Sequence, residues 1–396
     1  MSDQVPPARR SVKQRLTSLG VRVFVGLANT AYAGFKLLPV RRKVTFITWN
    51  ADRPSLDFRV LMERLRHLPQ PPAVVALCRQ LRRTPAGYAR YAVHMLHQMY
   101  AMATSQVVVL DAYCILASAL HHRPSLRVVQ IWHALGAFKK FGWSVVDKSE
   151  GWAEQSDMPA RDLARLLRMH AGYTDIAVSC AGAIPCFAEA FNADPAVVRI
   201  AWLPRADVLR DETAMAELRS RILAAHPELG GGRVVLYAPT LRRSSMNAER
   251  VGELAEAVRA GGWKLIVKTH AIRGETGESY LPDSAIDVPE FSAFELLALA
   301  DAVITDYSAI VYEAYLRTIP VFFYAYDMAA YEEARGFYTP VSQFPAGVYT
   351  SAADLVRDMT TQAVDVPSIR AFTDIFLEDS PRRVDILDLI DPARTA

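Results

Sequence analysis

Cysteine is scarce in this chain of 396 residues, and the few cysteines present are scattered. Cys78, Cys114, Cys180 and Cys186 include no close C-x-x-C pair. This spacing indicates neither a zinc site nor a disulfide framework, and it fits a protein of a reducing, cytosolic setting. We interpret each cysteine as a small buried hydrophobe.

Two motifs of common nucleotide-dependent enzymes are also missing. No G-x-G-x-x-G follows an expected strand, and glycines 230–232 precede a strand as a turn would, which disfavours a dinucleotide oxidoreductase. No D-x-D occurs, so we expect no tightly bound cofactor or metal, with room only for loosely bound Mg²⁺. The net charge of +3 is close to balance and does not indicate a nucleic acid as partner.

Acidic residues are absent from residues 9–43, which carry nine Lys or Arg. A mostly apolar stretch, 16–40, lies between the basic ends, but Arg22 and Lys36 interrupt it. It runs straight into a basic cluster and a strand, unlike a signal peptide. We expect residues 1–43 to contain a helix that lies on an anionic membrane surface. The alternatives are a helix packed on the protein's own core and a true membrane span.

The rest of the chain has globular composition, with 51% hydrophobic and 22% charged residues. Its length suits two domains. Short apolar runs alternate with helical stretches, and this pattern predicts parallel sheets covered on both faces, hence an α/β protein of two doubly wound domains. The expected divisions are a first domain over 44–205, a second over 206–365 with a polar turn at 204–211 as the join, and C-terminal helices over 366–396 that return to the first domain.

The expected strands fall into two series. The first series comprises 44–49, 73–78, 107–110, 127–132 and 175–179, and the second comprises 233–237, 263–268, 302–305 and 321–323. Expected helices between them include 56–65, 88–102 and 162–170.

A histidine follows the fourth strand in the sequence QIWHALGAFKKFG, residues 130–142. His133 then lies at the carboxyl end of the strand, where open α/β sheets bind ligands. Gly136 would let the backbone approach a ligand, and Lys139 supplies positive charge one turn away. A histidine can accept a proton from a hydroxyl near neutral pH, so we interpret His133 as a general base. The alternative is a hydrogen-bonded histidine in a strand-end loop.

Two basic segments follow strands of the second series. In YAPTLRRS, residues 237–244, Thr240 offers a hydroxyl and Arg242 a guanidinium that can bind phosphate. In Lys268-Thr269-His270, Lys268 and His270 could meet a diphosphate from one side. A solvated basic loop is the alternative for both.

The strongest segment is DAVITDYSAIVYEA, residues 301–314. A buried strand, a polar turn and a helix that begins near Ser308 would expose backbone N–H groups that bind phosphate, with the hydroxyls of Thr305 and Ser308 as further donors. Asp306 is either part of this site or a helix cap. Glu313 lies in the helix, where it could reach a ribose or be an ordinary surface charge.

Together these segments resemble the CDP-glycerol glycerophosphotransferase family, which builds teichoic acids and related capsule polymers. Further family-like segments are PVFFYAYD at 320–327, which ends in Asp327, RGFY at 335–338 and PAG at 345–347. The resemblance covers about residues 106–350. It departs from the family pattern at Ala134, Ala271 and Ala309, which replace a glycine, a proline and a serine.

The resemblance implies a GT-B architecture, with two Rossmann-like domains that face each other, the second holding a cytidine nucleotide. It implies transfer of a polyol phosphate, most plausibly glycerol phosphate, from a CDP-activated donor to a hydroxyl of a lipid- or glycan-linked acceptor, with His133 and His270 as catalytic residues. It also implies peripheral attachment to the cytoplasmic face of the cell membrane, with self-association left open. A sugar-nucleotide glycosyltransferase and a catalytically dead scaffold of the same fold are the alternatives.

Overall fold

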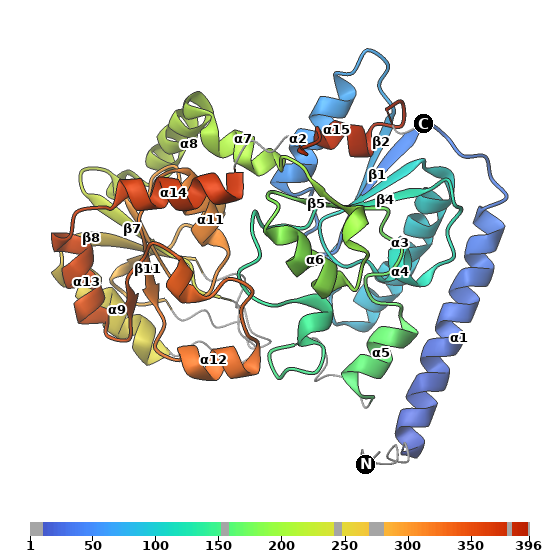
Figure 1. Ribbon diagram of the computed structural model, residues 1–396, viewed down its shortest axis with the longest axis horizontal. Helices are drawn as coiled ribbons and strands as arrows, with labels where there is room; N and C mark the ends of the chain where they lie inside the picture. Colours follow the sequence, from blue (N-terminus) through green and yellow to red (C-terminus); the bar gives the residue numbers. More distant parts are fainter. Residues whose placement is uncertain (1–10, 152–157, 241–247, 269–280, 378–381, 395–396) are drawn as a thin grey trace.

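The computed structural model describes residues 11–151, 158–240, 248–268, 281–377 and 382–394. Within them the chain forms two parallel six-stranded sheets, each flanked by helices, and Figure 1 shows the two units side by side. The first sheet has the order β2-β1-β3-β4-β5-β6 and the second β12-β11-β10-β7-β8-β9. The α/β architecture of two doubly wound units is therefore confirmed.

The strands of the first sheet are β1 (Lys43–Thr48), β2 (Ala73–Cys78), β3 (Val107–Leu110), β4 (Arg127–Gln130), β5 (Asp175–Val178) and β6 (Val198–Ile200). Those of the second are β7 (Arg233–Tyr237), β8 (Trp263–Val267), β9 (Ala285–Ile286), β10 (Ala302–Thr305), β11 (Val321–Tyr324) and β12 (Val348–Tyr349). The strands absent from the sequence-based prediction, β6, β9 and β12, have two or three residues each and lie at sheet edges, where such short apolar runs give little signal.

The helices that connect these strands in the first unit are α2 (Leu56–Arg66), α3 (Pro85–Thr104), α4 (Ile115–Ala119), α5 (Ala160–Leu166), α6 (Ala183–Phe191) and the 3₁₀ turn η1 (Gly142–Val145). Those of the second are α8 (Glu212–Ala225), α9 (Ala248–Ala260), α10 (Ala293–Leu296), α11 (Ile310–Leu316), α12 (Met328–Ala334) and α13 (Ala352–Thr361). Alternate strand residues point to opposite faces, so Val107 and Val109 pack toward α2 while Val108 and Leu110 pack toward α3 and α4.

The prediction of a polar turn at 204–211 is wrong, because this segment forms the helix α7 (Pro204–Arg210). Pro204 occupies the first turn, where a missing N–H costs nothing and the fixed φ favours a helix. After the second sheet, α14 (Val366–Leu377) packs on α11, while α15 (Ile386–Ile390) contacts β3 of the first. Val384 forms a bridge with Ala201 just before α15 begins.

The N-terminal helix α1 (Val12–Phe35) starts at a capping box on Ser11 and runs along the outside of the first unit, against α3 and α5 (Figure 1). Large apolar side chains along one side of it are exposed: Val12, Leu16, Leu19, Val23 and Leu27. Among the described residues, no helix combines the length and the apolar character that a membrane crossing needs.

The two units share one hydrophobic core, which runs from α2 and α7 into α8 and α11. Phe138, from the loop after β4, lies against Phe323, Phe337 and Phe344 of the second unit at ring-centroid distances of 5.8, 5.5 and 4.7 Å. The backbone of Lys139 forms an antiparallel bridge with Phe337. The loop that carries His133 is thus packed into the second unit.

Gly136 allows the His133 loop to pack closely against the second unit. From the sequence it was expected to allow a ligand to approach the backbone. A Cβ atom built on it would lie 2.5 Å from the ring of Tyr312, which is buried in α11. A rigid buried ring cannot yield, so only glycine fits without moving the two units apart.

We therefore expect Gly136→Ala to lower the free energy of unfolding by about 1–3 kcal/mol, the usual cost of overpacking. Gly26→Ala is the matched control, because a Cβ at Gly26 in α1 meets no atom within 4 Å. Urea denaturation followed by tryptophan fluorescence measures both. Equal stability of the two variants would contradict the packing role.

Candidate active site at the junction of the two sheets

His133 follows β4 and lies at the carboxyl edge of the first sheet, as predicted. Its Nδ1 lies 3.0 Å from the backbone oxygen of Asp111, which follows β3, and its ring stacks on Trp132 at 4.4 Å. Because a carbonyl oxygen only accepts hydrogen bonds, Nδ1 carries the proton in the neutral ring and Nε2 keeps its lone pair. The side chain is exposed, and the hydrogen bond to Asp111 fixes the orientation of its imidazole ring.

Trp132 has a φ of 53°, in the left-handed region that residues other than glycine rarely adopt. Its amide donates to the side-chain oxygen of Gln130 over 2.9 Å, and its ring packs on Phe141 and Phe191. These contacts hold the chain in a turn that costs about 1–3 kcal/mol. The turn aims the side chain of His133 outward from the strand end.

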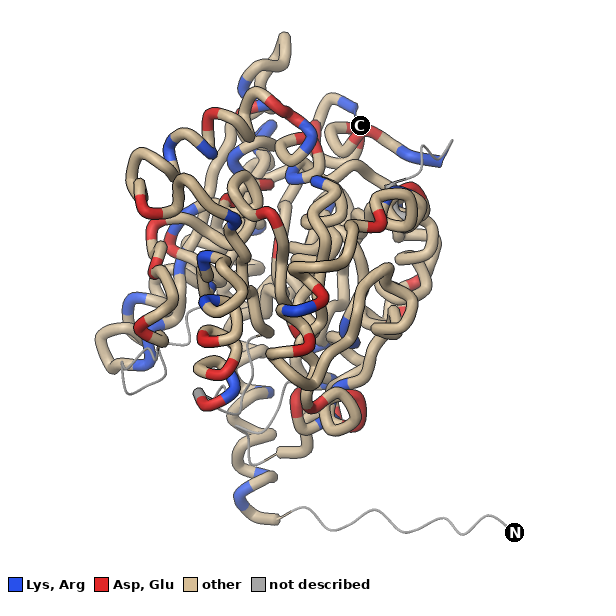
Figure 2. The backbone as a smooth tube through the Cα atoms, turned by 90° about the vertical axis from the view of Figure 1, so that its left-hand side faces the viewer, with Lys and Arg blue, Asp and Glu red and all other residues tan. Residues whose placement is uncertain are grey.

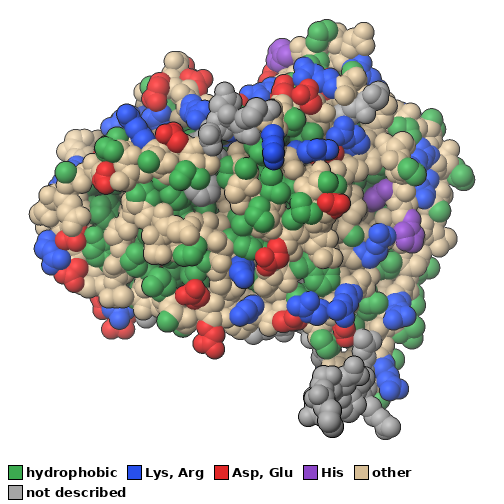
Figure 3. Space-filling view, in the orientation of Figure 1, with side chains coloured by type: hydrophobic (Ala, Val, Ile, Leu, Met, Phe, Trp, Pro, Cys, Tyr) green, Lys and Arg blue, Asp and Glu red, His purple; other side chains and the backbone are tan. Residues whose placement is uncertain are grey.

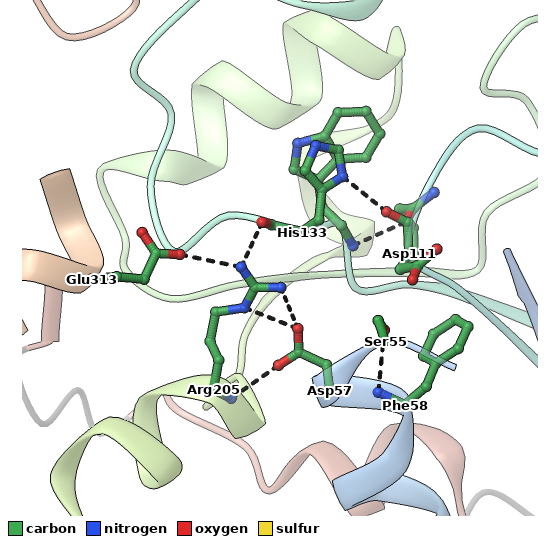
Figure 4. Close-up of polar contacts among 9 residues, drawn as sticks. Ser55, Asp57, Phe58, Asp111, His133, Arg205 and Glu313 are labelled. Atoms are coloured by element: carbon green, nitrogen blue, oxygen red, sulfur yellow. Dashed lines mark hydrogen bonds and ion pairs between the residues drawn. The ribbon is translucent and has the colours of Figure 1, made fainter. Parts of the chain in front are cut away.

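A buried arginine, Arg205 of α7, connects His133 to both units (Figure 4). Its backbone N–H and its Nε donate to the two carboxylate oxygens of Asp57 in α2, each over 2.9 Å. Its Nη1 donates to the backbone oxygen of His133 over 2.6 Å and to Oε1 of Glu313 in α11 over 3.1 Å. We call Asp57, Arg205 and Glu313 the Arg205 bridge.

The Arg205 bridge is almost dry. The side chains of Arg205, Asp57 and Glu313 are 14, 2 and 4% exposed. Burial alone would lower the pKa of Arg205, but Asp57 and Glu313 raise it above its usual value, so the guanidinium stays charged. Burial raises the pKa of Glu313, which Arg205 opposes, and the second oxygen of Glu313 has no hydrogen-bond partner among the described residues.

Asp111 adds a further buried carboxyl group under His133. Burial raises its pKa, while hydrogen bonds with Thr48 and Ser55 oppose this rise. Asp57, Asp111 and Arg205 were not predicted from the sequence. Asp111 directly follows β3, and Asp57 lies in the first turn of α2, the helix that follows β1. Polar residues after a strand often lie in ligand sites, as was expected of His133, so the same signal could have indicated both.

The second unit contributes its own strand ends to the same junction. Lys139 Nζ donates to Thr240 Oγ1 over 3.1 Å, which joins the His133 loop to the segment after β7. The amides of Thr240 and Tyr307 donate to Oδ1 of Asp306 over 2.7 and 2.5 Å. Asp306 therefore fixes the ends of β7 and β10 relative to each other. The Lys139–Thr240 contact lies at the same strand end, because Thr240 follows β7.

The remaining predicted residues of the second unit differ in how deeply they are buried and in their hydrogen-bond partners. Thr305 is fully buried, and its hydroxyl donates to the backbone oxygen of Ala238 over 2.7 Å. Ser308 is partly exposed just before α11, and Asp327 accepts from the Tyr307 hydroxyl over 2.9 Å. Lys268 Nζ donates to the backbone oxygen of Val288 over 2.7 Å, and burial lowers its pKa.

The structure thus brings Lys139, Thr240 and Asp306 together, and Arg205 joins the backbone of His133 to Glu313 of the second unit. Two predicted residues, Arg242 and His270, lie outside the described residues. Among the described residues, no group of three or more His, Cys, Asp or Glu side chains is arranged to hold a metal ion.

Two parallel six-stranded sheets, with His133 and Lys139 on a loop of the first unit and Thr240 after a strand of the second, form a GT-B fold. A model of the family described as CDP-glycerol:poly(glycerophosphate) glycerophosphotransferase matches residues 31–380. The chain belongs to this family.

Relatives of known role are similar over much of the chain. It is 30% identical to a teichoic acid ribitol-phosphate primase of Bacillus spizizenii over 90% of this chain and 92% of that one. It is 26% identical to a teichoic acid glycerol-phosphate primase of Bacillus subtilis over 71% of this chain and 72% of that one. A poly(ribitol-phosphate) polymerase of Bacillus spizizenii is 26% identical over 89% of this chain, which covers 56% of that longer protein.

Solved structures of the wall teichoic acid polymerase TagF have the same fold. A variant with one histidine replaced by asparagine superposes with a TM-score of 0.70 and 18% identity over 94% of each chain. The unaltered TagF gives 0.68 and 18% over 94% of this chain and 95% of that one. The GT-B fold predicted from the resemblance is therefore confirmed.

We expect Arg205→Met to lower the free energy of unfolding by about 3–5 kcal/mol, because it leaves two buried carboxylates without their cation. Adding Asp57→Asn and Glu313→Gln should recover part of this loss, since little buried charge then remains unpaired. Thermal and urea unfolding of both variants test this. A single variant as stable as the parent, or no recovery in the triple variant, would show that the Arg205 bridge does not join the units.

Proposed function

We propose that this protein transfers a polyol phosphate from a CDP-activated donor to a hydroxyl group of a membrane- or glycan-linked acceptor and releases CMP. The observation that carries the proposal is the oriented imidazole of His133, on the same loop as the Lys139–Thr240 contact between the two units, in a chain that belongs to this family. The ribitol-phosphate and glycerol-phosphate primases among its relatives support both polyols as candidate donors.

The proposed reaction uses the two sides of the junction for different tasks. The acceptor hydroxyl attacks the phosphorus next to the polyol, and its proton passes to Nε2 of His133. A phosphorus–oxygen bond to the acceptor forms as the bond to CMP breaks, and CMP leaves with the electron pair. Lys139, Thr240 and Ser308 offer donors for the diphosphate, with Lys268, Arg242 and His270 as further candidates. Phosphoryl transfer depends mainly on positioning and electrostatics, which suits this set.

A variant of the base tests the chemistry. His133→Asn keeps a side-chain N–H that can donate to the Asp111 oxygen but has no proton acceptor of suitable pKa, so we expect CMP release to fall about 10²–10⁴-fold. His67→Asn, at a site where the side chain is 73% exposed, is the control. Both variants are assayed with CDP-glycerol, CDP-ribitol and UDP-sugars, with and without Mg²⁺.

Three outcomes of this assay would contradict the proposal or the assignment of its base. Release of UDP in place of CMP would favour a sugar-nucleotide glycosyltransferase. Near-normal turnover by His133→Asn would remove the assignment of the base. A folded parent protein that binds a CDP-polyol without turnover would favour the inactive scaffold.

We also propose that α1 attaches the protein to the cytoplasmic face of the membrane. Its exposed apolar residues recur every three or four positions, so they share one side of the helix, and Lys13, Arg15 and Arg22 flank them. Figure 2 shows Lys and Arg along α1, whose sequence contains no acidic residue. Apolar side chains inserted among lipids with cations at the headgroups are the pattern of an interfacial helix.

We expect Leu16→Glu with Leu27→Glu to lower binding to phosphatidylglycerol vesicles roughly tenfold or more, because each leucine loses about 1.5–3 kcal/mol of burial. Val364→Glu with Ile375→Glu, at exposed apolar sites of the second unit, is the control pair. Sedimentation with vesicles measures both, and equal loss in the two pairs would contradict a specific role of α1.

A further inference from the structure

A pocket of about 450 Å³ opens on the first unit, away from the junction. It lies among η1, α5 and the end of α6, and its lining includes Trp143, Phe191, Asn192 and the arginines 161, 165 and 168. α5 packs against α1, so the pocket lies next to the helix proposed to lie on the membrane. Figure 3 shows Lys and Arg side chains gathered where α5 lies.

The three arginines recur at intervals of four and three residues, so they project from one side of α5 and its C-terminal turn. All three are exposed. Arg161 donates to Asp147 over 2.6 Å. The side chains of Arg165 and Arg168 form no hydrogen bond or ion pair with any residue that the structure describes. Two guanidinium groups with open donors therefore face one hollow.

The floor of the pocket is rigid and aromatic. The indole N–H of Trp143 donates to the backbone oxygen of Met169 over 2.9 Å, which fixes the ring. Phe191 packs edge-on against Trp132 at 5.3 Å, and Trp132 stacks on His133. Two aromatic rings thus lead from the pocket to the proposed base.

Unusual backbone conformations gather around the same place. Arg168 and Asn192, both in the lining, have φ values of 49°, and His170 between them has 60°. His170 is buried, and its ring stacks on that of Phe191 at 4.3 Å. Trp132, which also contacts Phe191, has a φ of 53°. Asn192 is the C-cap of α6 and Arg168 follows the C-cap of α5, and helices commonly end in this conformation, so both lining residues lie at helix C-termini.

We infer that this pocket binds phosphate groups of the acceptor, as a phosphodiester or diphosphate. Paired guanidinium groups suit phosphate because each can donate two parallel hydrogen bonds. The acceptor is favoured over the donor because Trp132 and Phe191 lie between the pocket and the junction where Lys139 contacts Thr240. The inference rests on the proposed function, since it assumes that a phosphate-bearing acceptor reaches His133 from the side of α1.

The test compares Arg165→Gln with Arg168→Gln in one protein against Arg221→Gln with Arg370→Gln in another. The control arginines are exposed, lie on α8 and α14, and have no ion pair among the described residues. The probes are a water-soluble short-alkyl glycosyl diphosphate and the same alkyl glycoside without phosphate, each offered as acceptor with CDP-glycerol and CDP-ribitol.

We expect the α5 variant to raise KM for the diphosphate acceptor about tenfold or more, corresponding to a charge-assisted hydrogen bond or two. KM for the CDP-polyol, and kcat at saturating acceptor, should stay within twofold of the parent. With the phosphate-free acceptor, the α5 and control variants should behave alike. Calorimetric titration of the diphosphate probe into each protein, without donor, should show the same tenfold difference in Kd.

Three results would overturn the inference: an equal change with both acceptors, a raised KM for the donor, or loss of binding to phosphatidylglycerol vesicles with unchanged Kd for the soluble probe. The last would assign the arginines to lipid headgroups. If the parent protein releases no CMP with any acceptor, the proposed function fails, and the calorimetric comparison still decides whether the arginines bind a diphosphate.

Discussion

The Arg205 bridge is the interaction on which the geometry of the junction depends. One guanidinium group holds a carboxylate from α2, a carboxylate from α11 and the backbone oxygen of His133. Buried charges are costly unless every partner is well placed, so the bridge is satisfied in one relative position of the two units and strongly opposed in others. The shared apolar core holds the two units together but does not select one relative orientation, because apolar contacts are not directional. The Arg205 bridge selects that orientation.

This arrangement explains how an exposed imidazole can be precisely held. The carbonyl of His133 is bonded to Arg205, its Nδ1 to the carbonyl of Asp111, and its ring lies on Trp132. The left-handed turn at Trp132 is tolerated because these contacts fix the chain on either side of it. When the ring accepts a proton, the carbonyl dipole of Asp111 stabilises the resulting positive charge. A displacement of about 1 Å in such a group can cost a hundredfold in rate, so the network under the base matters as much as the base.

The sequence was sufficient for the longer strands and for His133, which follows one of them, but not for the short edge strands or for Asp111. Val107–Leu110 and Arg233–Tyr237 were predicted to the residue, because buried parallel strands are short continuous apolar runs. The placement of His133 at a sheet edge followed from the same reading. The partners of Arg205 could not be predicted, since they lie 148 and 108 residues away in sequence and their pairing exists only after both sheets have formed. For the same reason Glu313 was expected either near a ribose or as an ordinary surface charge, and Gly136 near a ligand, although each faces the other unit.

The order of features through the first unit suggests how one fold separates two large substrates. The exposed apolar side of α1, the arginines of α5, the rings of Phe191 and Trp132, and then His133 follow one another through direct packing contacts. Under the proposed function, a charged acceptor bound along this line would reach His133 without crossing the side of the junction proposed to bind the diphosphate. The nucleotide side can then be closed and rigid, as Asp306 and the Arg205 bridge make it, because the second substrate does not pass through it. Under the proposed function, separate approaches would keep the like-charged phosphates of the acceptor and the donor apart until both reach the junction.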